Sequence, residues 1–272
     1  MTRLLTGQGH GKMHLLGWSR GGQLGYAYLN GESQIPQALR HVAGFIPVDV
    51  YLKTDDAQQR QDACARFLST SANVKSGIFA NDTGKNFAPL GLLAQVDPQG
   101  ETSVPAFKPL TNEQTGHLVG AATFLLVDPP PVPAYHFTGG LWDSSGKVSG
   151  LAYTDPARWF DFVSKGKPYQ PFQQIADAEA STCDDPSIAD VPFDDHLHDI
   201  TVPVLYVGAG GGYGSSGVYT TTLLGSSDVS TNVVELYPEE QRLLDLGHGD
   251  IFYADDADAL FWSSIKGFIL SH

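Results

Sequence analysis

Cysteine, basic residues and long apolar runs are all scarce in this chain of 272 residues. The two cysteines, Cys64 and Cys183, form no CxxC pair, which excludes a zinc ribbon and leaves a single disulfide possible but not inferable. Only 16 Lys and Arg oppose 30 Asp and Glu, a net charge of −14. Such a chain is repelled by phosphate backbones and anionic bilayers, so we expect no nucleic-acid partner. No apolar run approaches the roughly 20 residues of a membrane span.

The N-terminal sequence MTRLLTGQGHGK has no apolar core, so no export signal is visible and the compartment stays open. In contrast, glycine (30) and proline (17) are plentiful, which indicates many loops inside a folded domain. Apolar residues make up 42% of the chain, enough for a sizeable core. The length suits one large domain or two small ones.

Four short apolar runs predict buried strands, at residues 13–17, 42–48, 201–207 and 231–236. Because helical patterns or long crossovers separate them, we expect a parallel α/β sheet with helices on both faces. Two helices flank this pattern. The first carries Leu24, Tyr28 and Leu29 at helical spacing, and the last presents one apolar face made of Ala257, Phe261, Ile265, Phe268 and Ile269.

The middle of the chain has a different character. Helical patterns at 57–68, 87–95, 115–126 and 156–163 alternate with polar loops, and strand-like runs are scarce. We therefore predict three segments: a core at 1–53, a large, mainly helical cap or lid insertion at 54–198, and a second core segment at 199–272.

The sharpest motif is Gly17-Trp18-Ser19-Arg20-Gly21, a G-x-S-x-G between a predicted strand and a predicted helix. A nucleophilic serine needs a sharp strand-to-helix turn, and small residues two positions on either side avoid clashes there. The turn lifts the Ser19 hydroxyl above the sheet edge. It also leaves the backbone N–H of Arg20 free to stabilise an oxyanion.

A serine nucleophile needs a base, and His248 is the best placed of the nine histidines. It lies between two glycines, after the last predicted strand and before the final helix. The HLLGWSRGG elbow, the GHGD loop and the order serine, acid, histidine resemble the C-terminal half of an α/β-hydrolase with a large lid. The resemblance covers the elbow region and about the last 70 residues; the insertion resembles a cap only by position.

The acid of the triad departs from the common pattern of that family. The acid usually follows the strand after the cap, but here that strand ends in VGAGGGYGSSG, without Asp or Glu. A minority of the family carries the acid after the strand that follows the nucleophile helix, and that position is Asp49. The resemblance therefore favours Asp49 as the residue that orients His248, with Asp228 and Asp245 as weaker candidates.

The strands that precede the nucleophile in α/β-hydrolases have no counterpart here, since Ser19 comes so early. The loop that normally supplies the second oxyanion donor is missing with them. We therefore expect this chain to be the C-terminal portion of a longer hydrolase, with an unpaired sheet edge if it folds alone.

These features predict a serine hydrolase that acts on a small-molecule ester, the substrate class that the resemblance implies. Its triad calls for no metal or organic cofactor, and the oligomeric state stays open. Aromatic residues of the insertion either wall an acyl pocket or form the insertion's own core: Phe137, Trp142, Trp159, Phe160 and Phe162.

The alternatives are an inactive fragment or binding module with the same fold, and a nucleotide-binding oxidoreductase that uses the GAGGGYG loop. The spacing of that loop is not G-x-G-x-x-G, so we expect no dinucleotide binding. A cluster of metal-ligand types at 194–199, DDHLHD, fits a solvated linker better than a metal site.

Overall fold

The computed structural model describes residues 11–80, 87–127, 129–166 and 170–272. At its centre lies a parallel sheet of four strands in the order β1-β2-β5-β6. These strands are Met13–Trp18 (β1), Val42–Val48 (β2), Val204–Ala209 (β5) and Val229–Val234 (β6). The predicted parallel sheet is confirmed, and β2 covers the predicted residues. Strand β5 begins later than predicted, after Pro203, which has no N–H to donate to a ladder.

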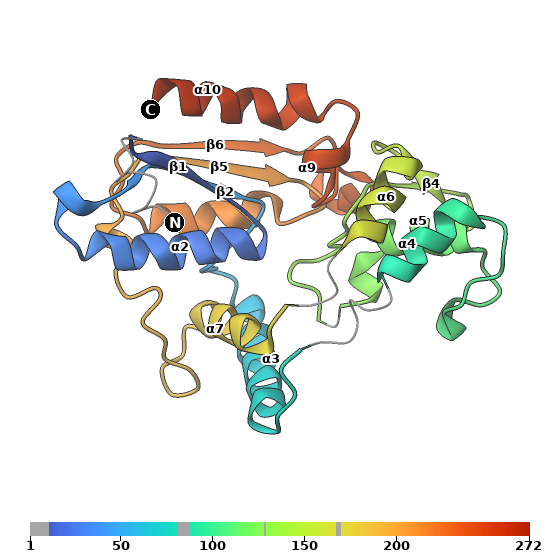
Figure 1. Ribbon diagram of the computed structural model, residues 1–272, viewed down its shortest axis with the longest axis horizontal. Helices are drawn as coiled ribbons and strands as arrows, with labels where there is room; N and C mark the ends of the chain where they lie inside the picture. The colour runs from blue at the N-terminus through green and yellow to red at the C-terminus, as the bar shows by residue number, and fades with distance from the viewer. Residues whose placement is uncertain (1–10, 81–86, 128, 167–169) are drawn as a thin grey trace.

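Helices cover both faces of this sheet, with α2 on one side and α10 on the other (Figure 1). The helices are α2 (Arg20–Ser33), α3 (Ala57–Lys75), α4 (Phe87–Val96), α5 (Asn112–Ala121), α6 (Pro156–Lys165), α7 (Phe172–Cys183), α8 (Val218–Thr222), α9 (Asp250–Tyr253) and α10 (Ser263–Ser271). A short antiparallel hairpin of β3 (Gly140–Trp142) and β4 (Val148–Leu151) stands apart from the main sheet. No helix within the described ranges is both long and apolar enough for a membrane span.

Helix α2 packs on the sheet through a different face from the one its apolar spacing predicted. Leu29 is buried, but Leu24 and Tyr28 are 49% and 40% exposed. The face on the sheet instead carries Tyr26, whose ring packs on Phe45 at a centroid distance of 4.9 Å, and Gly25, where a Cβ would lie 2.5 Å from Cε2 of Phe45. Apolar periodicity does not detect such a contact, since glycine contributes no apolar side chain.

The opposite face of the sheet is covered by the C-terminal helical segment. Phe261, in a π-helical turn at Asp258–Trp262, and Ile265 and Phe268 of α10 pack against Ile46 and Val207. Ala257 is buried with them, as predicted, whereas Ile269 is 42% exposed. Placing Ile269 on this face was wrong. It follows Phe268 by one residue, about 100° further round the helix.

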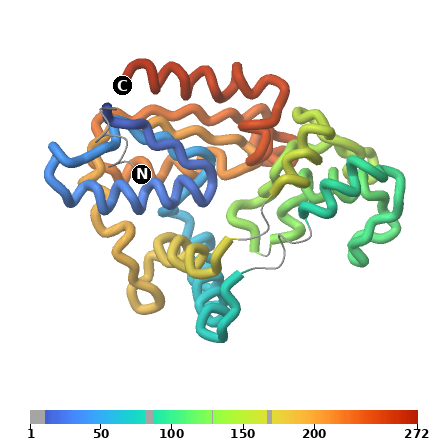
Figure 2. Tube along the Cα trace, in the orientation of Figure 1, coloured from blue at the N-terminus to red at the C-terminus, as the bar shows by residue number. Residues whose placement is uncertain are grey.

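The segment between β2 and β5 divides into two groups of elements, which Figures 1 and 2 show on different sides of the molecule. Helices α3 and α7 pack on each other and are joined by a disulfide between Cys64 and Cys183. Helices α4, α5 and α6 and the hairpin surround a separate apolar cluster around Trp159 and Phe160. The sequence analysis did not predict α7 or the hairpin, and the boundaries of the cap at 54–198 stay a prediction.

Candidate active site

Ser19 lies in a strained turn between β1 and α2. Its φ and ψ angles are 54° and −129°, a positive φ that L-residues rarely adopt. The turn is fixed at both ends, because Ser19 N donates to Val48 O at 2.9 Å and Ser19 O accepts from Gly22 N at 2.8 Å. Strain of this kind costs of order 1–3 kcal/mol and persists only where the surrounding structure holds it.

The glycines of this elbow differ in the space that their neighbours leave for a side chain. A Cβ on Gly17 would lie 2.3 Å from Gly21 O, and one on Gly22 would lie 2.5 Å from Cγ1 of Val50. At Gly21 a Cβ would meet nothing within 4 Å. The steric requirement predicted for Gly21 was therefore wrong. Close packing falls on Gly17 and Gly22, because the first turn of α2 lies against β1 and the loop after β2.

Arg20 is the first residue of α2, and its backbone N–H has no acceptor within the described residues. The N–H groups of Gly22 and Gln23 instead point back to Ser19 O. A helix leaves its first N–H groups without intrahelical partners, so the Arg20 N–H is available to a ligand oxygen beside Ser19.

Asp49 and His248 meet at the C-terminal edge of the sheet. His248 Nδ1 lies 2.6 Å from Asp49 Oδ2, and the two side chains are 1% and 0% exposed. The other carboxylate oxygen of Asp49 accepts three backbone N–H groups, from Ala209, Tyr213 and Gly214, each at 3.0 Å. These bonds fix the carboxylate, so it can hold the imidazole in one orientation.

The glycine-rich loop after β5 surrounds that carboxylate. A Cβ on Gly212 would lie 1.8 Å from Asp49 Oδ2, and one on Gly211 would lie 2.2 Å from Nε2 of the buried His136. The loop needs glycine because its backbone must come close enough to donate to Asp49. This packing accounts for the GAGGGYG sequence without a nucleotide.

The other two candidate acids lie elsewhere. Asp245 is buried and accepts backbone N–H groups from Leu236 at 2.9 Å and from Leu246 at 2.7 Å, which fixes the loop after β6. Asp228 is paired with His272 at 3.0 Å near the C-terminus. Of the three acids, the structure brings Asp49 to His248.

Aromatic side chains enclose His248. The Trp18 indole stacks on its imidazole at a centroid distance of 4.7 Å, and Trp18 Nε1 donates to His248 O at 3.2 Å. Tyr135, Phe137 and Tyr213 follow at 5.5, 5.3 and 5.7 Å. Within the described residues no hydrogen bond joins Ser19 Oγ to His248.

The aromatic residues of the insertion divide between two surroundings, and the acyl pocket that they were expected to line stays a prediction. Phe137 contacts His248, and Phe162 contacts Trp18 at 6.4 Å, so these two reach the site. Trp159 and Phe160 are 3% and 4% exposed in the cluster of α4–α6, and Trp142 packs against it. Trp18, Tyr135 and Tyr213 were not predicted to lie beside His248, because they come from three separate segments and share no motif.

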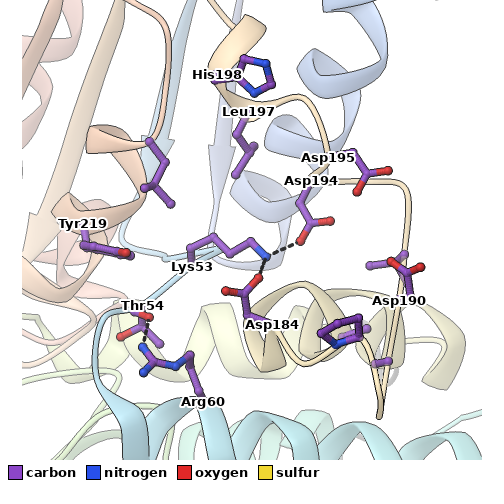
Figure 3. A pocket seen from close by; sticks show the side chains of 15 residues that line it. Lys53, Thr54, Arg60, Asp184, Asp190, Asp194, Asp195, Leu197, His198 and Tyr219 are labelled. Carbon is purple, nitrogen blue, oxygen red and sulfur yellow. Dashed lines mark hydrogen bonds and ion pairs between the residues drawn. The ribbon is translucent and has the colours of Figure 1, made fainter.

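The acidic cluster DDHLHD lies beside a cavity of about 510 Å³ that is lined by Asp194, Asp195 and His198 (Figure 3). Lys53 pairs there with Asp184 and, at 2.7 Å, with Asp194. His196 and His198 both lie beside Asp199, at 3.5 and 3.4 Å. Within the described residues no three His, Cys, Asp or Glu side chains converge as a metal site would require.

Comparison with known proteins finds no matching family model and no match among curated proteins. Solved structures do match over the whole chain. A metagenome-derived lipolytic enzyme is 14% identical with a TM-score of 0.43, and the chain spans 69% of its length. For a monoglyceride lipase from Saccharomyces cerevisiae the values are 14%, 0.46 and 65%, and for a putative non-heme bromoperoxidase from Mycobacterium tuberculosis 11%, 0.45 and 72%.

The class of fold follows from the arrangement itself. A parallel sheet carries helices on both faces, a strained serine sits between β1 and α2, and a paired acid and histidine lie at the same edge of the sheet. The described part of the chain therefore has a partial α/β-hydrolase fold, as the sequence resemblance implied.

Proposed function

We propose that the chain is a serine hydrolase that cleaves a carboxylic ester through an acyl-enzyme. The observation that carries this proposal is the buried contact of 2.6 Å between His248 Nδ1 and Asp49 Oδ2, at the sheet edge that also holds the Ser19 elbow. A strained serine and a fixed imidazole at one edge are the parts that acyl transfer requires.

In the proposed reaction Ser19 Oγ attacks the ester carbonyl while His248 Nε2 takes the hydroxyl proton. The tetrahedral intermediate then expels the alcohol, which receives that proton from His248. Water, activated by the same imidazole, releases the acid and restores Ser19. Asp49 accepts the Nδ1 hydrogen bond throughout, which sets the tautomer and stabilises the imidazolium.

The Arg20 N–H is proposed to donate to the oxyanion that forms in each step. In serine hydrolases the loss of one such donor lowers kcat by about 10²–10³, and we expect the Arg20 N–H to contribute to kcat on this scale. The aromatic side chains around His248 exclude water and suit an ester with an apolar acyl or aryl group.

Labelling with a fluorophosphonate tests the proposal directly. We expect the purified chain to label once, and we expect Ser19→Ala and His248→Ala to abolish the labelling while the fold is kept. Asp49→Asn should slow labelling by about 10³ or more, because it favours the wrong imidazole tautomer. Ser187→Ala, at an exposed turn, is the matched control and should label as the parent does.

The outcomes separate the enzyme from its alternative. Labelling that survives Ser19→Ala would contradict the assignment of the nucleophile. Folded protein that never labels would instead favour a binding module that keeps the elbow only as scaffold. If the chain labels, hydrolysis of p-nitrophenyl esters of different lengths by the unlabelled protein would then identify the acyl length that it accepts.

A further inference from the structure

An apolar cavity of about 500 Å³, separate from the cavity beside the DDHLHD cluster, lies between α2 and α7, close to the elbow. Leu24 and Ala27 of α2 form one wall, and Ala178 of α7, Leu52 and Phe193 form the others. Its size falls within the range of small-molecule sites. The exposure of Leu24, which helical spacing alone did not predict, results from its position on this cavity rather than on the sheet.

The polar group that distinguishes this cavity is the Arg20 guanidinium. Its Nη1 donates to Gln23 Oε1 at 2.9 Å, and its Nη2 lies 3.7 Å from Glu179 Oε1, beyond hydrogen-bonding distance. A guanidinium carries five N–H donors, so most of those on Arg20 have no acceptor within the described residues. The side chain is 20% exposed and therefore accessible from the cavity.

Glu179 forms an ion pair with Arg20 at 3.7 Å, but it accepts its hydrogen bond from a second arginine. Arg66 Nε donates to Glu179 Oε2 at 2.9 Å, and Arg66 Nη1 is buried without an acceptor in the described part of the chain. Two guanidinium groups thus share one carboxylate at this end of the cavity. Asp177, which also lines the cavity, accepts a hydrogen bond from Gln173 at 2.7 Å.

We propose that this cavity binds an aliphatic carboxylate, with its chain between α2 and α7 and its carboxylate on Arg20. The apolar walls take the chain, and the free N–H groups of the guanidinium match the two oxygens of a carboxylate. Glu179 and Asp177 balance the charges of Arg20 and Arg66, so the preference for a carboxylate rests on the unused N–H donors of Arg20 and not on a net positive charge. The proposal concerns binding alone and does not depend on turnover at Ser19.

Calorimetric titration of the full chain with octanoate and with 1-octanol tests this site. We expect one octanoate per chain and binding of octanol at least tenfold weaker, because the alcohol cannot form charge-assisted bonds with Arg20. The same values are expected in Ser19→Ala protein, which separates this result from any outcome for the proposed hydrolase.

Three variants locate the ligand. Arg20→Gln should weaken octanoate at least tenfold and leave octanol unchanged, and Arg20→Lys should keep part of the preference because it retains the charge without the planar fork. Ala27→Trp should abolish binding of both ligands by filling the cavity. Lys165→Gln, a loss of one positive charge at an exposed pair with Asp161, should change neither affinity.

Equal affinity for octanoate and octanol would overturn the role of Arg20. Binding that survives Ala27→Trp would overturn the location, and the absence of any octanoate binding to folded protein would overturn the site as a whole. Circular dichroism of each variant establishes whether it is folded. If Arg20→Gln does not fold, the affinities of Arg20→Lys for octanoate and octanol test the role of Arg20 instead.

Discussion

The glycines of the elbow differ in how closely other atoms approach them, although Gly17 and Gly21 hold equivalent positions in the motif. Gly17 and Gly22 meet backbone or Val50 side-chain atoms, whereas Gly21 faces open space at the start of α2. The difference arises from the angle at which α2 leaves the sheet, and the sequence motif does not specify that angle.

Alanine substitutions at Gly21 and Gly22 should therefore have opposite effects. Gly22→Ala places a Cβ 2.5 Å from Val50 Cγ1, and we expect a loss of about 1–3 kcal/mol in the free energy of unfolding. Gly21→Ala should be neutral or stabilise by about 0.5–1 kcal/mol, because alanine favours an exposed helix. Urea denaturation of the pair measures both values. Equal destabilisation by the two changes would contradict this reading of the elbow.

Asp250, two residues after His248, is a buried acid that the sequence analysis did not single out. It accepts hydrogen bonds from Thr154 Oγ1 at 2.5 Å and from the N–H groups of Gly139 and Gly247 at 2.7 Å. Burial outweighs these bonds and raises the pKa of Asp250 from 3.8 to about 6. The folded chain thus holds this proton more tightly than the unfolded chain does.

The contribution of Asp250 to stability is therefore full below about pH 4 and declines as the pH rises to about 6. The loss in the free energy of unfolding is on the order of 3 kcal/mol, and above about pH 6 the contribution of Asp250 no longer changes with pH. In Asp250→Asn the amide can accept both glycine N–H groups and donate to Thr154, so this pH dependence should vanish. Urea denaturation of both proteins from pH 4 to pH 8 measures it. A difference between the two that does not change with pH would show that the raised pKa is absent.

At the scale of elements, the pairing of α3 with α7 links the chain before and after the α4–α6 group. The disulfide closes 119 residues of sequence, and Thr182 of α7 donates to Leu52 O at 2.8 Å in the loop after β2. These contacts hold α7 against the core, where Glu179 reaches Arg20 and Arg66.

Removal of this disulfide should loosen α3 and α7 before it affects the sheet. We expect the double variant Cys64→Ala, Cys183→Ala to lose about 2–4 kcal/mol in the free energy of unfolding, since the cross-link restricts the unfolded chain. Hydrogen exchange should rise in α3 and α7 and stay slow in β2 and β5. Dithiothreitol treatment of the parent chain should reproduce both effects. An unchanged exchange rate in the two helices would argue against this role.

At the scale of the whole molecule, one edge of the sheet stands open. Strand β1 pairs with β2 on one side, and no described strand pairs with its other side. Its sequence MHLLGW has no Lys, Pro or acidic residue that would block addition of a strand, and Leu16 is 37% exposed. The net charge of −14 opposes contact between copies.

The chain should therefore self-associate through β1 when salt screens that charge. Sedimentation velocity should show more association as protein concentration and ionic strength rise. Leu16→Lys should suppress it, whereas Leu270→Lys, at a residue that is 87% exposed on α10, should not. A chain that stays monomeric at high salt, or equal effects of the two lysines, would exclude β1 as the contact.

The sequence by itself determined the parallel sheet, the position of the elbow and the choice of Ser19 and His248 as candidate site residues. Strand runs and turn glycines are local signals, and the four strands appear within three residues of their predicted starts. The helical segments at 57–68, 87–95 and 156–163 were also found, because helix formation depends mainly on neighbours in sequence.

Only the tertiary structure brought Asp49, the acid that the resemblance favoured, to His248. It alone decided whether the two cysteines pair and which face of α2 lies on the sheet. Asp49 and His248 are 199 residues apart, and Cys64 and Cys183 are 119 apart. Such contacts depend on how β5 inserts beside β2 and how α7 packs on α3. They leave no periodic trace in the sequence, because each involves single residues brought together by packing over long separations.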